Sequence, residues 1–177
     1  MNPGDIVVGH IAALDDVNVL RAVGVFDIAM IRDLRNVLVS LFQFKLDKVI
    51  PTGPGDALWR EADPRDRFVS FLAFHSDKDM EFVKSVAQSI LTDPRACRVR
   101  FEDMLAGVLD GPLRDRLASI EDNLPGRFAE ALGMKRCTSN PTFSGKLAEW
   151  RNVWDDRVDR FFRESGLQDL NARLGYA

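Results

Sequence analysis

Cysteine is scarce in this sequence of 177 residues, which contains only Cys97 and Cys137. Two widely separated cysteines form neither a disulfide framework nor a metal-binding motif, so we interpret them as reduced thiols of a cytoplasmic protein. Long apolar runs are also lacking: none approaches the roughly 18 residues that a membrane-spanning helix needs. The first ten residues lack the basic start and apolar stretch of a secretion signal. We therefore expect a cytoplasmic domain without a membrane span.

An excess of positive charge is lacking as well. The sequence has 24 Lys and Arg against 27 Asp and Glu, a net charge of −3, and the two signs are interspersed. This distribution gives no sign of a nucleic-acid partner. Apolar residues, by contrast, make up 46% of the chain and include 12 phenylalanines, enough for a globular interior. The length suits one domain, and we expect residues 1–177 to form it.

Short apolar segments alternate with helical patterns along the first part of the chain. Residues 4–10 and 25–31 are typical of strands, and the nearly unbroken apolar run at 25–31 is typical of a strand covered on both faces. Residues 13–24 and 36–49 place their apolar side chains at helical spacing. This α/β rhythm favours a parallel sheet flanked by helices.

The rest of the chain is richer in helical patterns. Residues 47–66 hold three prolines and two glycines, which predicts a long surface loop. A helical pattern follows and is broken or capped near Ser76. Residues 97–101 alternate as a strand does. Helices are predicted behind it, including one helix over 147–166.

Five stretches resemble the sulfotransferase superfamily that uses 3′-phosphoadenosine 5′-phosphosulfate (PAPS). "IRDLRNVLVS" is similar to the family's Arg-Asp-Pro-Arg-Asp-x-x-x-Ser segment, with leucine in place of the proline. "VRFEDMLAG" resembles its Val-Arg-Tyr-Glu-Asp-Leu junction between strand and helix. The other three, in the order and spacing of the family, are "PGDIVVGHI", "FSGKLAEWRNVW" and "LNARLGY". The resemblance implies a P-loop nucleotide-kinase-like fold with a three-layer parallel sheet flanked by helices.

The resemblance also implies roles for single residues. Arg32 and Ser40 would bind the 3′-phosphate of PAPS or of its product PAP, and Gly145 and Lys146 would remain from a loop that contributes to this site. His10 would take the proton from the attacking hydroxyl or amine, a task that suits a side chain with a pKa near 6.5. His75 matches no position of the family, and either a structural or a surface position is predicted for it.

The chemistry of arginine agrees with this assignment. An arginine at the carboxyl end of a parallel strand lies in the crevice where α/β folds bind ligands, and its planar guanidinium suits a bidentate phosphate contact. Other interpretations stay open. Arg32 could pair with Asp33, or Arg35 with Asp27, on the surface, and Ser40 could face solvent.

One expected element of the family is missing. Nothing in residues 1–9 resembles its Pro-Lys-Ser-Gly-Thr-Thr-Trp phosphate loop, so we expect the first, central strand of the sheet to be absent. A separate N-terminal chain or a second copy could supply that strand, the flanking strands at 25–31 and 97–101 could pair directly, or the chain could be a fragment of a longer reading frame.

The predicted function follows from the resemblance to the sulfotransferases and from the missing phosphate loop. We predict sulfuryl transfer from PAPS to a hydroxyl or amine of a small-molecule or carbohydrate acceptor, with an N-terminal part outside this chain. The alternatives are a non-catalytic remnant that serves binding or self-association as a homo-oligomer, and a module that only binds the nucleotide.

Overall fold

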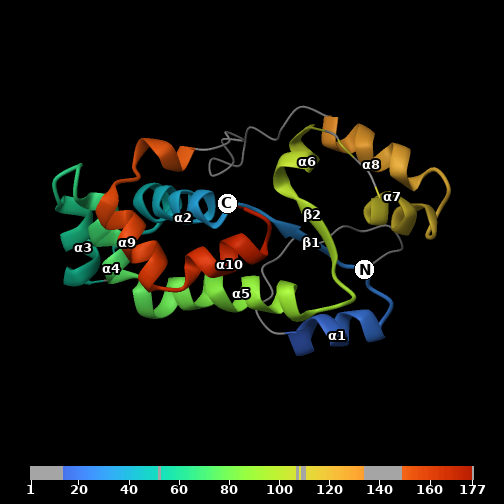
Figure 1. Ribbon diagram of the computed structural model, residues 1–177, viewed down its shortest axis with the longest axis horizontal. Helices are drawn as coiled ribbons and strands as arrows, with labels where there is room; N and C mark the ends of the chain where they lie inside the picture. Colours follow the sequence, from blue (N-terminus) through green and yellow to red (C-terminus); the bar gives the residue numbers. More distant parts are fainter. Residues whose placement is uncertain (1–13, 52, 107, 109–110, 134–148, 177) are drawn as a thin grey trace.

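Helices dominate the computed structural model, which describes residues 14–51, 53–106, 108, 111–133 and 149–176 (Figure 1). Two short parallel strands, β1 and β2, pair with each other. The elements in chain order are α1 (Leu14–Ala22), β1 (Ile28–Ile31), α2 (Leu34–Lys48), α3 (Pro54–Glu61), α4 (Arg67–Phe74), the π-helical turn η1 (Ser76–Met80), α5 (Glu81–Thr92), β2 (Cys97–Arg100), α6 (Phe101–Ala106), α7 (Gly111–Ala118), α8 (Leu124–Gly133), the 3₁₀ turn η2 (Glu149–Asn152), α9 (Asp156–Glu164) and α10 (Leu167–Arg173).

The predicted three-layer α/β sulfotransferase fold is wrong for this chain. The sheet among the described residues has two strands of four residues each, far too little to form a layer between helices. The strand predicted at 4–10 lies outside the described residues. The reason for the error is that the apolar faces of the helices pack mainly on one another, and a local apolar pattern does not say whether its partner is a sheet or a helix.

The two strands that were predicted to flank a missing central strand pair directly. Ile28 lies opposite Cys97 and Ile31 lies opposite Arg100 in a parallel register. Of the three alternatives drawn from the sequence, this is the one that the structure has. Direct pairing gives each strand one hydrogen-bonded edge and leaves its other edge unpaired among the described residues.

Two apolar clusters lie on either side of the small sheet (Figure 1). The larger is formed by α2 to α5, α9 and α10, and its fully buried side chains include Trp59, Phe71 and Leu167. The smaller is formed by β2 with α7 and α8, around Val99 and Leu113. Since burial of one large apolar side chain contributes about 1.5–3 kcal/mol, the larger helical cluster dominates the stability of the fold.

The segment at 47–66 is not a long loop. It contains α3, which begins at Pro54 and buries Trp59 in the core. Proline is tolerated in the first turn of a helix because the amide that it lacks would have no partner there. The prolines and glycines of this segment therefore mark the start of a helix.

The other helical predictions are closer to the structure. The break near Ser76 is confirmed as the π-helical turn η1 between α4 and α5. The single helix predicted over 147–166 is divided instead into η2 and α9. The division falls at Asp155, whose carboxylate accepts hydrogen bonds from the amides of Arg157 and Val158 and so begins α9.

Candidate functional site

The carboxyl ends of β1 and β2 lie side by side, and we refer to this end of the sheet, with Arg32 and Phe101 that follow the strands, as the carboxyl edge. Arg32 is half-buried there, with its guanidinium carbon 4.5 Å from the centre of the Phe101 ring. A cation over an aromatic face is stabilised by roughly 0.5–2 kcal/mol. The arginine singled out by the sequence thus lies at the carboxyl end of a parallel strand pair, the end where open α/β sheets bind ligands.

Burial lowers the pKa of the Arg32 guanidinium, while the charges of Glu102, Glu149 and Asp33 raise it. Arginine keeps its proton in proteins because its pKa is so high, so the group stays a cation. Its positive charge therefore lies among three carboxylates. An anionic ligand would have to compete with them for the guanidinium.

Asp33 and Asn171 fix the backbone next to Arg32. The Asp33 carboxylate caps α2 by accepting a hydrogen bond from the amide of Arg35, and it also pairs with the guanidinium of Arg35 at 2.8 Å. Asn171 of α10 accepts a bond from the amide of Leu34 at 2.7 Å and donates one to Asp33 at 3.2 Å. Asp33 and Asn171 are both nearly fully buried. The start of α2 is thereby held against α10.

Trp150 in η2 borders the carboxyl edge from a third segment of the chain. Its amide donates a hydrogen bond to Asn36 of α2 at 3.5 Å. The guanidinium carbons of Arg35 and Arg151 lie 4.2 Å and 4.9 Å from the centre of the indole. The indole is thus occupied by protein cations and packs partly against the core, which makes it a poor platform for a nucleobase.

The segment after α10 closes the same edge. The Tyr176 hydroxyl donates to Glu102 at 2.6 Å and lies 3.3 Å from the carbonyl oxygen of Ile31. Arg100 donates to the carbonyl of Gly175 at 2.5 Å. Burial and the Glu102 carboxylate raise the pKa of Tyr176 far above its usual value, so the hydroxyl keeps its proton.

The residues that were predicted as a site have different outcomes. Arg32 is at the carboxyl edge. Ser40 is half-buried in α2, six residues after its start and therefore roughly 9 Å further along the helix axis. His10, Gly145 and Lys146 lie outside the described residues. The predicted roles of all five stay predictions.

The observed ion pairs differ from the surface ion pairs that were considered from the sequence. Arg35 pairs with buried Asp33, and Asp27 pairs with Arg21 of α1 at 2.5 Å. Sequence analysis assigned no role to Asn171, Glu102 or Tyr176. The signal for them was present, because all three fall in stretches that resemble the sulfotransferases.

His75 lies in a separate buried cluster, so of the two positions predicted for it, structural or surface, the structure has the first. Its ring contacts Phe71 at 4.6 Å between centres, and its Nδ1 is hydrogen-bonded to Asp79, which also pairs with Lys45 at 3.2 Å. Burial lowers the pKa of His75, although the Asp79 carboxylate opposes that shift. This cluster joins α2, α4 and η1 within the larger core.

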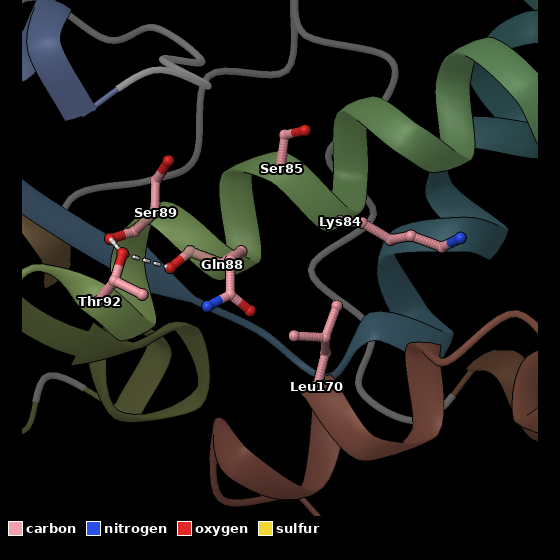
Figure 2. A pocket seen from close by; sticks show the side chains of 6 residues that line it. All are labelled: Lys84, Ser85, Gln88, Ser89, Thr92 and Leu170. Atoms are coloured by element: carbon pink, nitrogen blue, oxygen red, sulfur yellow. Dashed lines mark hydrogen bonds between the residues drawn. The ribbon is translucent and has the colours of Figure 1, made fainter.

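The hollows on the described surface include an open groove and a smaller cavity. An open groove of about 420 Å³ lies between α5 and α10, with a row of polar side chains on one wall and Leu170 on the other (Figure 2). The hydroxyl of Thr92 is turned back to the carbonyls of Gln88 and Ser89, and Lys84 pairs with Glu81. A smaller cavity of about 110 Å³ adjoins Ile31 and Arg100 at the carboxyl edge. Thr92 and Lys84 of the groove are thus engaged within α5, and Gln88 accepts a hydrogen bond from Arg173 of α10.

Metal ligation and membrane insertion find no support in the part of the chain that the structure describes. No three His, Cys, Asp or Glu side chains lie together there as a metal site would require. None of the helices in that part is long and apolar enough to cross a bilayer.

Comparison with known proteins adds no relative. No protein-family model, curated protein or solved structure matches this chain. Nothing in these comparisons links the chain to the sulfotransferases, so the resemblance depends on the five sequence stretches alone.

Proposed function

We propose that the carboxyl edge binds the 3′-phosphate of an adenosine nucleotide of the PAPS or PAP type. Arg32 would be the main cation, and Ser40 of α2 would add a hydroxyl donor. In this proposal the phosphate takes the place of the carboxylates that now surround the Arg32 guanidinium. Arginine suits this exchange because its planar group binds a phosphate with two parallel hydrogen bonds.

One observation carries the proposal: four separate stretches that resemble the family meet at this edge. They contribute Arg32, Glu102, Trp150 and Tyr176, which come from four elements or loops between residues 31 and 176. Short motif matches that arise by chance would have no reason to gather at one place in the fold. A shared binding site gives them such a reason.

The wider activity is proposed on the same basis. Sulfuryl transfer would need His10 to remove the proton from an acceptor hydroxyl or amine while the nucleotide is held through its 3′-phosphate. The acceptor would be a small molecule or carbohydrate. Because residues 1–9 contain no phosphate loop, transfer of labelled sulfate from PAPS is measured with an N-terminal part that supplies this loop, for the natural sequence and for His10→Ala, which tests this step separately from binding.

Calorimetric titration with PAP and with 5′-AMP tests the binding proposal, because 5′-AMP lacks the 3′-phosphate. We expect PAP to bind at least tenfold more tightly than 5′-AMP. Arg32→Ala should reduce the affinity for PAP to that for 5′-AMP, since a hydrogen bond to a charged group contributes about 1.5–3 kcal/mol. Arg32→Lys should recover part of the loss, because it keeps the charge without the fork.

Arg163→Ala is the matched control for the loss of one positive charge. Arg163 lies on α9, is largely exposed and pairs with Asp159. Thermal unfolding of each variant establishes that it is folded. Equal affinity of Arg32→Ala and the natural protein for PAP would refute the assignment, and so would equal affinity of the natural protein for PAP and 5′-AMP.

A second candidate function is self-association without catalysis. Met30, in the middle of β1, is 49% exposed, and each of the two strands has an edge that no described residue pairs. Unpaired strand edges beside apolar side chains favour association with another strand. Light scattering over a range of concentrations tests this candidate, which a monomer at every concentration would exclude.

A further inference from the structure

The carboxylate of Glu102 is fixed in place by the segment that follows α10. The Tyr176 hydroxyl donates to it at 2.6 Å, and a hydrogen bond to a carboxylate is stronger than one between neutral groups. Tyr176 is itself held from the other side, because the guanidinium carbon of Arg100 lies 4.9 Å from the centre of its ring. The Glu102 side chain is thus less mobile than that of an ordinary surface glutamate.

This fixed carboxylate lies near the end of β1, which Arg32 follows. The Tyr176 hydroxyl that binds Glu102 is also 3.3 Å from the carbonyl of Ile31, the residue before Arg32. Phe101, the residue before Glu102, carries the Arg32 guanidinium over its ring. Arg32 and Glu102 are therefore linked in two ways. The Tyr176 hydroxyl contacts both Glu102 and the residue before Arg32, and the Arg32 guanidinium packs on the residue before Glu102. In agreement, the Glu102 charge is the largest of those that raise the pKa of Arg32.

We propose that Glu102, held by Tyr176, is a built-in competitor for the anion that binds at Arg32. This inference rests on the function proposed above and concerns the regulation of the same site. A carboxylate near the guanidinium partly offsets its positive charge when no ligand is bound. It lowers the affinity for every anion, and most for an anion that carries two negative charges, because the repulsion from a carboxylate grows with the charge of the ligand.

Competition of this kind works in both directions. An anion that binds at Arg32 weakens the attraction between Glu102 and the guanidinium, and by linkage any change that weakens that attraction strengthens binding of the anion by the same factor. The hydrogen bond between Tyr176 and Glu102 should respond when the site is filled. Tyr176 is the one tyrosine of the sequence, so it reports this response without ambiguity.

Glu102→Gln tests the proposal with little change in shape. Glutamine keeps an oxygen that can accept the Tyr176 hydroxyl, but it lacks the negative charge. We expect calorimetry to give roughly tenfold tighter binding of both PAP and inorganic phosphate, the effect typical of removing one opposing charge at a partly buried site. Glu164→Gln on α9 removes the same charge at an exposed position away from the edge and should leave both affinities unchanged.

Fluorine NMR of the protein with 3-fluorotyrosine at position 176 supplies a readout that a merely structural role of Glu102 would not move. Titration with PAP should shift the single resonance with the dissociation constant found by calorimetry. Glu102→Gln should move the resonance of the ligand-free protein toward its ligand-bound position.

The outcomes separate this inference from the proposed function. Tight binding of PAP by the natural protein together with equal affinities of Glu102→Gln and Glu164→Gln would refute the role of Glu102 alone. A tyrosine resonance that does not respond to saturating PAP would refute it as well. Absence of PAP binding in all three proteins would overturn both proposals.

Discussion

Asn171 is the residue whose removal should damage the candidate site most through the fold. Its side chain is 2% exposed and forms two hydrogen bonds across 137 or more residues of sequence, one from the Leu34 amide and one to Asp33. Asn171→Ala removes both bonds. It also leaves the Leu34 amide at the start of α2 without this acceptor, in a place where Leu34 is itself buried.

The expected cost follows from these contacts. A buried donor left without a partner costs about 1–3 kcal/mol, and each lost hydrogen bond adds about 0.5–1.5 kcal/mol. We expect Asn171→Ala to lower the free energy of unfolding by about 2–4 kcal/mol. For a chain of this size that corresponds to a fall in Tm of roughly 5–10 °C. Urea unfolding followed by circular dichroism measures the change directly.

Two further variants make the measurement specific. Asn152→Ala removes an exposed asparagine at the end of η2 and should change the stability by less than about 0.5 kcal/mol. Asn171→Asp keeps an acceptor for the Leu34 amide but places a second carboxylate beside Asp33, so its cost should be large at pH 7 and smaller near pH 4. A change below about 0.5 kcal/mol for Asn171→Ala would show that the network contributes nothing, and the reasoning would be wrong.

Two other predictions concern a buried histidine and a glycine. Burial lowers the pKa of His75, so this histidine binds a proton more readily in the unfolded chain than in the native protein. The free energy of unfolding is therefore at its full value above the unfolded pKa of about 6.5 and decreases as the pH falls below it. Urea unfolding between pH 7.5 and 5 should therefore show a smaller loss for His75→Phe than for the natural protein, and equal losses would contradict this. Gly175 has φ of 90°, and an added Cβ would lie 2.7 Å from Arg100, so Gly175→Ala should cost about 1–2 kcal/mol, whereas Gly53→Ala, with open space and extended backbone, should cost much less. Equal thermal stabilities of the two alanine variants would refute the reasoning.

The sequence was informative where structure depends on near neighbours. The helical spacing in α2, the break at Ser76, the apolar run of β1 and the alternation in β2 were all identified from local patterns. Arg32 was correctly placed at the end of a strand for the same reason. Each of these features is decided by residues within about two turns of helix or one strand length of one another.

The sequence was misleading where the packing partner of an apolar face had to be predicted. The same apolar face of α2 could cover a wide sheet or pack on other helices, and the structure has the second arrangement around Leu38 and Phe71. The proximity of Glu102, Tyr176 and Arg32 could not be predicted either, because no local sequence pattern pairs residues so far apart. A motif resemblance marked these stretches but did not say that the charge of a carboxylate would act on the arginine.

The contacts at the carboxyl edge divide into two groups with different consequences. Asp33 and Asn171 are nearly fully buried and have fixed hydrogen-bond partners, so substituting them should affect the stability before it affects any ligand. Arg32 and Glu102 are half-buried, and the charge of Glu102 raises the pKa of Arg32, so substituting them should affect the binding of an anion more than the stability. A protein whose edge served only the fold would lose stability in Glu102→Gln and gain no affinity for phosphate. Tighter binding of phosphate at unchanged stability is the combination that a ligand site alone explains.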